Sequence, residues 1–288
     1  MKTGLSEKIF DCLNVVFFIA LAVLMFYPLW YVIMYSFSDP NIITFGNMYL
    51  KPTGFTLATY RNIMRQRTIY TGTQNSIFIT FFGTLINLAV LYLTAYPLSR
   101  DNLTGRKPIF AYFIFTMLFS GGMIPTYLVV RQFNMIDTLW ALIIPNALSI
   151  YYMLILIKFF KSIPESLFES AKLDGASELY IVFKIVLPLS LASLASIGLF
   201  CAVGHWNSYL SAMIYLNHVE RFPLQYILFG MLSRSFNPGD MGGINEIRVT
   251  PESIKMAAVV ISLVPILLVY PFIQKYFMSG VMLGSVKG

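Results

Sequence analysis

Long apolar runs separated by short polar segments dominate the chain. Because about 20 apolar residues span a bilayer as an α-helix, each of these runs predicts one membrane-spanning helix. The third run contains Gly121, Gly122 and Pro125, where we expect the helix to break. No long glycine- or serine-rich linker divides the sequence, which predicts a single all-α, polytopic membrane domain over residues 1–288. The six predicted spans cover approximately residues 13–35, 76–98, 108–130, 138–159, 187–206 and 254–277.

The segment between the fourth and fifth spans is polar, and its residues 168–188 read FESAKLDGASELYIVFKIVLP. Ser162 and Glu165 have the spacing of a capping box, which predicts that a helix begins there with Ser162 as its N-cap. Gly175 predicts the end of that helix, since glycine tolerates a positive φ. Ser177 predicts the N-cap of a second short helix that leads into the fifth span. We therefore expect an L-shaped pair of cytoplasmic helices.

The first of these two helices has an acidic face, because Glu165 and Glu169 lie one turn apart on it. Their like charges repel each other and destabilise the isolated helix. Ile163, Leu167 and Ala171, with Phe168 beside them, form its apolar stripe. One interpretation is an amphipathic helix that lies on the membrane surface. The other is a docking helix whose acidic face contacts a basic groove on a protein partner. The repulsion between the two acids favours the protein partner, because an anionic lipid surface would add to it.

The composition supports the membrane assignment, since 57% of the residues are hydrophobic and 11% are charged. The net charge of +7 does not indicate nucleic-acid binding, because the basic residues are scattered over short loops. Eleven of the 20 Lys and Arg residues fall in the predicted inner segments, and the short loop from Arg100 to Lys107 is the most basic. The positive-inside rule then predicts that both termini are cytoplasmic.

Several kinds of chemistry are absent from the pattern. All 13 acidic residues lie outside the six predicted spans, which argues against a proton-driven transporter with an acid in the membrane. His205 and His218 lack the neighbours of a metal site, and no cluster of histidines and acids suggests a membrane enzyme. No GxxxxGK[ST] loop is present, so ATP must be bound by another subunit if it supplies the energy. We expect no catalytic, cofactor-binding or metal-binding residue, and Cys12 and Cys201 are expected to pack as apolar side chains.

A few polar side chains lie within or beside the predicted spans. Hydrogen bonds between helices are one interpretation of each, and contact with a transported solute is the alternative. The candidates for a translocation pathway are Asn87, Asn146, Trp206 and Asn207. In an outer segment, a positive rim could attract anionic solutes such as uronic-acid oligosaccharides, although the same residues could anchor the chain to lipid headgroups. The rim consists of Arg61, Arg65 and Arg67.

The polar loop carries a resemblance to a known family. The runs Glu169-Ser170-Ala171, Asp174-Gly175-Ala176 and Leu187-Pro188 resemble the EAA loop of membrane subunits of bacterial ATP-binding-cassette (ABC) importers, with Ser170 where that family usually has alanine. GMIPTY at 122–127, Trp206-Asn207 and the tail FMSGVMLGSVKG at 277–288 extend the resemblance over most of the chain. Together they resemble the carbohydrate-uptake branch, and within it the second permease subunit of complex-oligosaccharide systems, similar to the maltose-system permease.

The resemblance implies a subunit of an importer in the bacterial cytoplasmic (inner) membrane that works by alternating access. Its expected partners are a homologous permease subunit, two cytoplasmic ATPase subunits that hold ATP and Mg, and an extracytoplasmic solute-binding protein that meets the outer loop at about 208–253. The alternatives are a permease for another solute, such as an amino acid or glycerol phosphate, and a secondary transporter. The residues that the resemblance assigns to ATPase contact are Glu165, Glu169, Ala171, Asp174, Gly175, Ser285 and Lys287.

Overall fold

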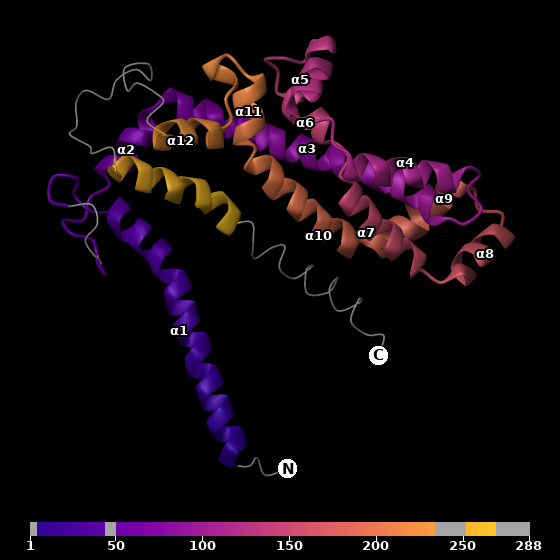
Figure 1. Cartoon of the computed structure of the whole chain (residues 1–288), viewed down its shortest axis with the longest axis horizontal. Helices are drawn as coiled ribbons and strands as arrows, with labels where there is room; N and C mark the ends of the chain where they lie inside the picture. The colour runs from indigo at the N-terminus through magenta and orange to yellow at the C-terminus, as the bar shows by residue number, and fades with distance from the viewer. Residues whose placement is uncertain (1–4, 44–49, 234–251, 269–288) are drawn as a thin grey trace. The chain divides into compact units, whose positions relative to one another are not determined.

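The structure is a computed structural model that describes residues 5–43, 50–233 and 252–268 (Figure 1). All regular elements in these ranges are helical. By chain contacts the protein divides into a first unit, residues 1–69 with 230–264, and a second unit, residues 70–229 with 265–288. The principal helices are α1 (Leu5–Ser36), α2 (Ala58–Arg65), α3 (Arg67–Ser99), α4 (Arg106–Leu118), α5 (Met123–Gln132), α6 (Trp140–Ile143), α7 (Ile150–Lys161), α8 (Glu165–Leu173), α9 (Glu178–Tyr180), α10 (Leu187–Trp206), α11 (Tyr209–Tyr215) and α12 (Leu224–Ser233).

In the first unit, α1 is a single membrane-length helix, and the described residues before Tyr35 in its apolar stretch, Ile9–Ser36, are not buried within the chain. This agrees with the first predicted span. The chain turns back after α1, and the backbone N–H of Thr56 donates a hydrogen bond to the Phe37 carbonyl, with an N···O distance of 2.9 Å. The hydroxyls of Ser36 and Tyr60 lie 2.7 Å apart, which joins the end of α1 to α2.

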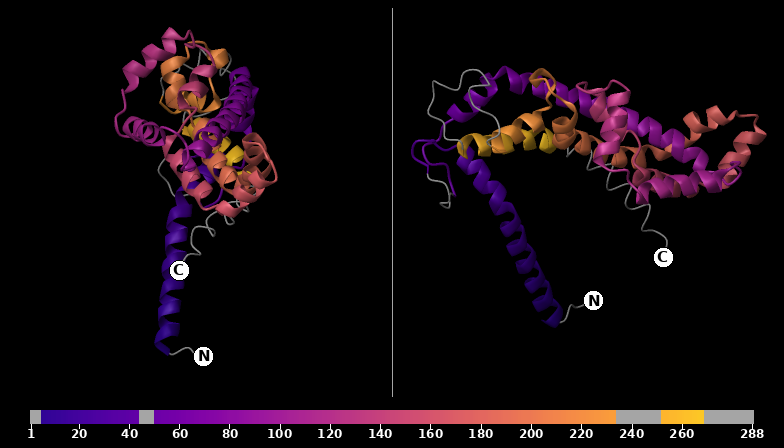
Figure 2. Two further views of the ribbon diagram at one scale, coloured as in Figure 1. Left: turned by 90° about the vertical axis from the view of Figure 1, so that its right-hand side faces the viewer. Right: turned by 45° about the horizontal axis from the view of Figure 1, so that its top comes forward.

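In the second unit, α3 is the central helix, and α10 lies beside it and beside α7 (Figures 1 and 2). The buried side of α3 repeats every three to four residues, as expected for a helix that packs along one seam. Small or polar residues occupy several of these positions, so neighbouring helices approach closely. The buried seam consists of Gly72, Ser76, Ile79, Gly83, Asn87, Leu91, Ala95 and Leu98.

Two of the predicted spans are bent. The predicted break in the third span is confirmed, because α4 and α5 meet at an angle of 116° at Gly122, where φ is +86°. The fourth predicted span, 138–159, also contains a break, which the sequence analysis did not predict. There α6 and the 3-10 helix Ile144–Asn146 meet α7 at 50°. The break follows from Pro145, which has no backbone N–H to continue an α-helical ladder.

The polar loop differs from its prediction at its start. Ser162 is not an N-cap, because its N–H and its hydroxyl both donate back to carbonyls of α7, and it therefore ends that helix. Pro164 instead occupies the N-cap position of α8. The predicted turn is confirmed by the φ of +77° at Gly175. The predicted cap of the second helix is also confirmed, since the Ser177 hydroxyl accepts a hydrogen bond from the Tyr180 N–H, with an O···N distance of 3.3 Å.

The second helix of the loop is not separate from the fifth span. Residues Glu178–Trp206 form one continuous helix that includes a π-helical turn, Ile181–Val186. A π turn forms hydrogen bonds five residues apart, and it lies just before Pro188, whose missing N–H would interrupt a regular α-helical ladder. The helix therefore continues past the proline where the sequence suggested a boundary.

The total of six spans stays a prediction. By length and composition, the described residues contain three membrane-length helices, or up to five if each bent pair is one span. Residues 252–268 are helical and coincide with the first part of the predicted sixth span. The remainder of that span lies outside the described residues.

The contact between Gly83 and α10 generates the first prediction. A Cβ atom on Gly83 would lie 2.6 Å from Nε2 of His205, whereas a Cβ on Gly204 would meet nothing within 4 Å. We expect Gly83→Ala to lower the free energy of unfolding by about 1 to 3 kcal/mol through overpacking, while the matched control Gly204→Ala leaves it unchanged or raises it. Thermal unfolding in detergent measures both, and equal stability of the two variants would contradict this packing.

Candidate functional site

The helix α8 is attached to the second unit through two of its side chains. Phe168 and Ala171 are buried in a hydrophobic cluster with Phe160 and Ile163. Leu167, which was predicted to share the apolar stripe, is exposed. The stripe therefore turns toward the chain through Phe168 and not through Leu167. Ala171, which the family resemblance assigns to contact with an ATPase subunit, is 8% exposed and packs against its own chain.

Arg100, directly after α3, holds α8 from the side. Its guanidinium carbon lies 3.8 Å from the centre of the Phe168 ring. Its Nη2 donates to Oε1 of Glu165 at 2.7 Å. The Arg100 side chain is only 16% exposed, whereas that of Glu165 is 65% exposed. One planar guanidinium thus combines a cation–π contact with an ion pair, which lysine cannot reproduce in the same geometry.

More polar contacts connect the same loops. Lys172 forms an ion pair with Glu178 at 2.9 Å, and the Tyr96 hydroxyl donates to the same carboxylate at 3.1 Å. Asp101 accepts from Lys161 at 3.2 Å and from Arg106 at 2.5 Å. The Lys161 hydrogen bond and the charges of both bases hold the pKa of Asp101 below its usual value.

These residues surround a cleft of about 370 Å³ whose lining includes Arg100, Asp101, Lys161, Glu165 and Lys172. The basic loop after α3 and the helix α8 therefore lie at the same end of the second unit, as the sequence predicted when it assigned both to one side of the membrane.

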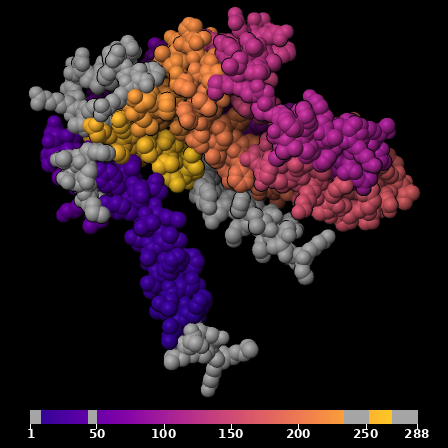
Figure 3. All heavy atoms as spheres, viewed as in Figure 1, coloured from indigo at the N-terminus to yellow at the C-terminus, as the bar shows by residue number. Residues whose placement is uncertain are grey.

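The acids of α8 divide into two groups. Glu165 is neutralised by Arg100, so the prediction that both Glu165 and Glu169 require an external partner is corrected for Glu165. Glu169 and Asp174 are exposed, and within the described residues neither forms an ion pair. The surface of α8 is open at the end of the second unit (Figure 3). Ser285 and Lys287, the predicted contacts in the tail, lie outside the described residues.

In the middle of α3, Asn87 supports the break in the fourth span. Its Nδ2 donates to the carbonyls of Asn146 and Ala147 at 2.7 and 2.9 Å. Its Oδ1 lies 2.5 Å from Nε2 of His205. Because both amide protons are donated to carbonyls, Oδ1 must accept, and the Nε2 of His205 therefore carries a hydrogen. Asn87 is 3% exposed, so it supports the bilayer-embedded break from inside the protein.

The other pathway candidates lie in different surroundings. Trp206 is buried at the end of α10. Asn146 is exposed next to the break, and its side chain donates weakly to the Leu142 carbonyl at 3.3 Å. Asn207 is exposed and donates from Nδ2 to the Val203 carbonyl at 3.0 Å. Asn146 and Asn207 are thus the two candidates that remain accessible, whereas Asn87 and Trp206 are part of the packed interior.

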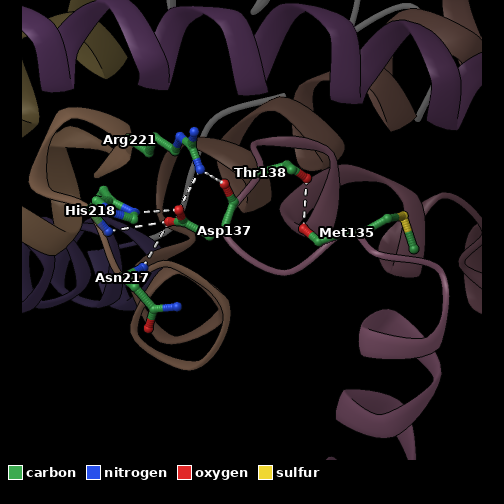
Figure 4. A network of polar contacts seen from close by, with 6 residues as sticks. All are labelled: Met135, Asp137, Thr138, Asn217, His218 and Arg221. Atoms are coloured by element: carbon green, nitrogen blue, oxygen red, sulfur yellow. Dashed lines mark hydrogen bonds and ion pairs between the residues drawn. The ribbon is translucent and has the colours of Figure 1, made fainter.

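At the other end of α3, a cluster of polar contacts holds two loops together (Figure 4). Asp137, which follows α5, accepts hydrogen bonds from the backbone N–H groups of Asn217 and His218 at 3.0 and 3.2 Å. Its carboxylate also contacts the His218 ring and the Arg221 guanidinium. We call these four residues the Asp137 clasp. Asn75 of α3 donates to carbonyls of the same segment, at Glu220 and Phe222.

The Asp137 clasp has no signal in the sequence beyond one lone acid near a predicted span. Asp137 has a φ of +59°, a conformation that Asp and Asn tolerate better than most residues. Burial, the largest single influence, disfavours its charged form, but the hydrogen bonds from Asn217 and His218 and the charge of Arg221 together lower the pKa of Asp137. The carboxylate is therefore ionised at neutral pH.

The two polar clusters lie on opposite sides of a bilayer. Asn75 contacts the segment of the Asp137 clasp, and Arg100, next to Ser99, contacts α8. From Asn75 to Ser99 an α-helix rises by about 36 Å, and the hydrocarbon core of a bilayer is about 30 Å thick. The helix α3 therefore connects a loop on one side of the membrane with α8 on the other.

A polytopic helical chain with an exposed, acidic helix between two spans defines a membrane transport subunit of the permease class. The chain belongs to the family of ABC transporter permease proteins. It is 44% identical to the polygalacturonan/rhamnogalacturonan transport system permease protein YtcP of Bacillus subtilis (strain 168) over 99% of this chain and 100% of that protein. It is 40% identical to the protein LplC of the same organism over 100% of this chain and 98% of that protein.

A solved structure agrees with this assignment. A chain in the crystal structure of a bacterial ABC transporter involved in the import of the acidic polysaccharide alginate matches with a TM-score of 0.89 and 32% sequence identity. The match covers 96% of this chain and 99% of that chain. A comparison with models of known protein families finds no match. The resemblance that the polar loop indicated is thus confirmed at the level of the family.

The Asp137 clasp generates the second prediction. A lowered pKa means that the carboxylate stabilises the fold above its ordinary pKa of 3.8 and loses this effect as the pH falls through the folded-state value. We expect Asp137→Asn, which keeps the side-chain shape, to lower stability by about 1 to 3 kcal/mol at pH 7. The difference from the unmodified protein should shrink below pH 3.8, as thermal unfolding at several pH values will measure. Glu220→Gln is the matched control, and a pH-independent difference would contradict the role of the charge.

Proposed function

We propose that this chain is the permease subunit of an ATP-driven, binding-protein-dependent importer of oligosaccharides, and that these oligosaccharides are acidic. The observation that carries the proposal is the full-length match to a chain of an alginate importer, together with the match to a permease named for polygalacturonan and rhamnogalacturonan transport. All of these polymers contain uronic acids. A permease for amino acids or glycerol phosphate, and a secondary transporter, have no comparable support.

The arginines before α3 support an anionic substrate. Arg61 and Arg65 lie one turn apart on α2, and both are exposed, as is Arg67. Exposed cations in this outer segment raise the local concentration of anionic solutes. The alternative, anchoring in lipid headgroups, predicts the same effect on all substrates. Within the membrane, Asn146 and Asn207 are the accessible candidates for solute contact.

The proposed partners are a homologous permease subunit, two cytoplasmic ATPase subunits and an extracytoplasmic solute-binding protein. In this assembly, ATP-driven closure of the ATPase pair moves α8 and switches the permease between inward-facing and outward-facing states. The end of the second unit that carries α8 and the basic loop from Arg100 to Lys107 is cytoplasmic, and so are both termini, in the bacterial cytoplasmic membrane. The clasped outer loops then face the binding protein.

The proposed contact with an ATPase subunit uses the exposed side of α8. Glu169 and Asp174 present negative charge that no ion pair neutralises in the part of the chain that the structure describes, and a basic cleft on the ATPase fits it. Gly175 sets the bend that orients this face. Glu165 and Ala171 contribute indirectly, since they attach α8 to its own chain. By the family resemblance, Ser285 and Lys287 of the tail are further contacts.

Reconstituted vesicles test the proposed function, and they give the third prediction. The full assembly, loaded with ATP, should import oligogalacturonides, and neutral oligosaccharides of the same length should be imported more slowly. Replacing Arg61, Arg65 and Arg67 by Gln should slow uptake of the acidic sugar by about tenfold at low salt and leave that of the neutral one unchanged. Equal losses for both sugars would favour lipid anchoring, and absence of ATP-dependent uptake would refute the importer.

The fourth prediction concerns α8. Glu169→Lys should weaken binding of the ATPase subunits by about tenfold or more, equivalent to roughly 1.4 kcal/mol, because it reverses the charge against a basic cleft. Gly175→Val should cost about 1 kcal/mol or more, since a β-branched residue is strained at positive φ, and it should misdirect α8 and abolish uptake. Copurification of the ATPase subunits in detergent measures assembly.

The control for these variants is Glu220→Lys, which reverses an exposed acid at the opposite end of α3 and should leave copurification unchanged. A base-to-acid change in the ATPase cleft should restore part of the binding lost in Glu169→Lys. Normal assembly and transport of both α8 variants would overturn the docking role, and with it the cytoplasmic assignment of this end.

A further inference from the structure

Arg100, the residue directly after α3, contacts one side of α8. Glu165 and Phe168 lie three residues apart on α8, so they share one side of it. The guanidinium of Arg100 contacts both at once, through the 2.7 Å ion pair and the 3.8 Å approach to the ring. Phe168 is 2% exposed, so the stacking of Arg100 on its ring is shielded from water, whereas the Glu165 side chain of the ion pair is 65% exposed. A displacement of α8 must displace Arg100 or break these contacts.

Along the chain, α8 is connected to α7 and to α9, and not to α3. After α8 the chain turns at Gly175, whose φ is +77° and whose surroundings are open, with nothing within 4 Å of a Cβ placed there. Before α8 the chain reverses between Lys161 and Glu165 through Pro164. Both connections carry contacts of their own, since Ile163 is buried in the same cluster as Phe168 and Lys172 forms an ion pair with Glu178 across the turn. Arg100 differs from them because it contacts α8 from the end of α3. The lateral contact with α3 is therefore a direct route for movement out of α8.

Beyond Arg100, α3 makes hydrogen bonds to the two spans that flank the loop. The Tyr96 hydroxyl donates to Glu178, and the Tyr92 hydroxyl donates to the Val182 carbonyl at 2.5 Å in the π turn before α10. Farther along, Asn87 holds the break between α6 and α7 and contacts His205 of α10. A shift of α3 would therefore displace its partners at three successive positions along the helix, at Tyr96, Tyr92 and Asn87.

We propose that Arg100 is a positioning residue that transmits displacement of α8 to α3, so that α3 carries the coupling movement across the membrane. This inference rests on the proposed function, because it requires an ATPase subunit that moves α8. It assigns the ion pair with Glu165 and the stacking on Phe168 a role in coupling, distinct from the docking that the outward-facing acids Glu169 and Asp174 perform.

The test uses the complete assembly in vesicles and measures the ATP hydrolysed per solute imported. Arg100→Gln removes both contacts with α8 but leaves Phe168 and Ala171 buried and the docking face unchanged, so the ATPase subunits should still copurify. We expect the ATP-to-solute ratio to rise at least about fivefold, the lower end of typical coupling factors. Arg100→Lys keeps the charge without the planar stack and should give an intermediate ratio.

Two further variants separate coupling from simple support. Reversing the pair, with Arg100→Glu and Glu165→Arg together, should restore part of the coupling lost in either single variant. Lys158→Gln, at an exposed base of α7 in the same end of the unit, is the matched control and should leave the ratio unchanged. If Arg100→Gln fails to assemble, Glu165→Gln, which removes the ion pair alone, takes its place.

The outcomes are distinct. An unchanged ATP-to-solute ratio in an assembled Arg100→Gln complex, or in Glu165→Gln where it replaces that variant, overturns the inference while leaving the importer itself intact. Loss of uptake and of ATP hydrolysis in the same proportion would also overturn it, because a residue that only supports the fold lowers both. Absence of ATP-dependent uptake in the unmodified assembly would refute the proposed function, and the inference with it.

Discussion

The second unit depends on one constraint, which is that a broken helix inside a bilayer must find hydrogen-bond partners for its backbone within the protein. At the break after Pro145, the carbonyls of Asn146 and Ala147 receive both amide protons of Asn87. His205 fixes the orientation of that amide, and the missing side chain of Gly83 leaves room for the His205 ring. A bent span is therefore stable because a neighbouring straight helix supplies the donors that water cannot.

The same constraint accounts for the polar residues of α3 nearer the loop. The π turn before α10 alters the pairing of its carbonyls, and Tyr92 donates to that of Val182. Ser190 donates to the carbonyl of Val186. A helix that supports irregular backbone at several heights must itself be regular and closely packed, which explains the small residues along its buried side. Stability and mechanical connection thus come from the same side chains.

The sequence analysis predicted the elements whose signals are local. It missed the contacts that depend on residues far apart in the chain. Apolar runs predicted the membrane-length helices of the described residues, and Gly175 and Ser177 predicted a turn and a cap because these signals act within three residues. Ser162 fits an N-cap and a helix end equally well, and only the extent of α7 decides. Arg100 lies 65 residues from Glu165, so no spacing rule reveals that this acid is neutralised. The Asp137 clasp was missed for the same reason.

The acids on and beside α8 are divided between two sides, as expected for a helix that both binds a partner and passes movement to the membrane helices. A helix that only rested on the membrane would have no need of a largely shielded arginine at its side. A helix that was only part of the fold would not keep two acids outward that form no ion pair within the described residues. Here one side is fixed to α3 through Arg100 and Phe168, while Glu169 and Asp174 remain open. In the proposed mechanism, docking and transmission of movement therefore use different residues, so a partner that binds Glu169 and Asp174 does not compete for the contacts that connect α8 to α3.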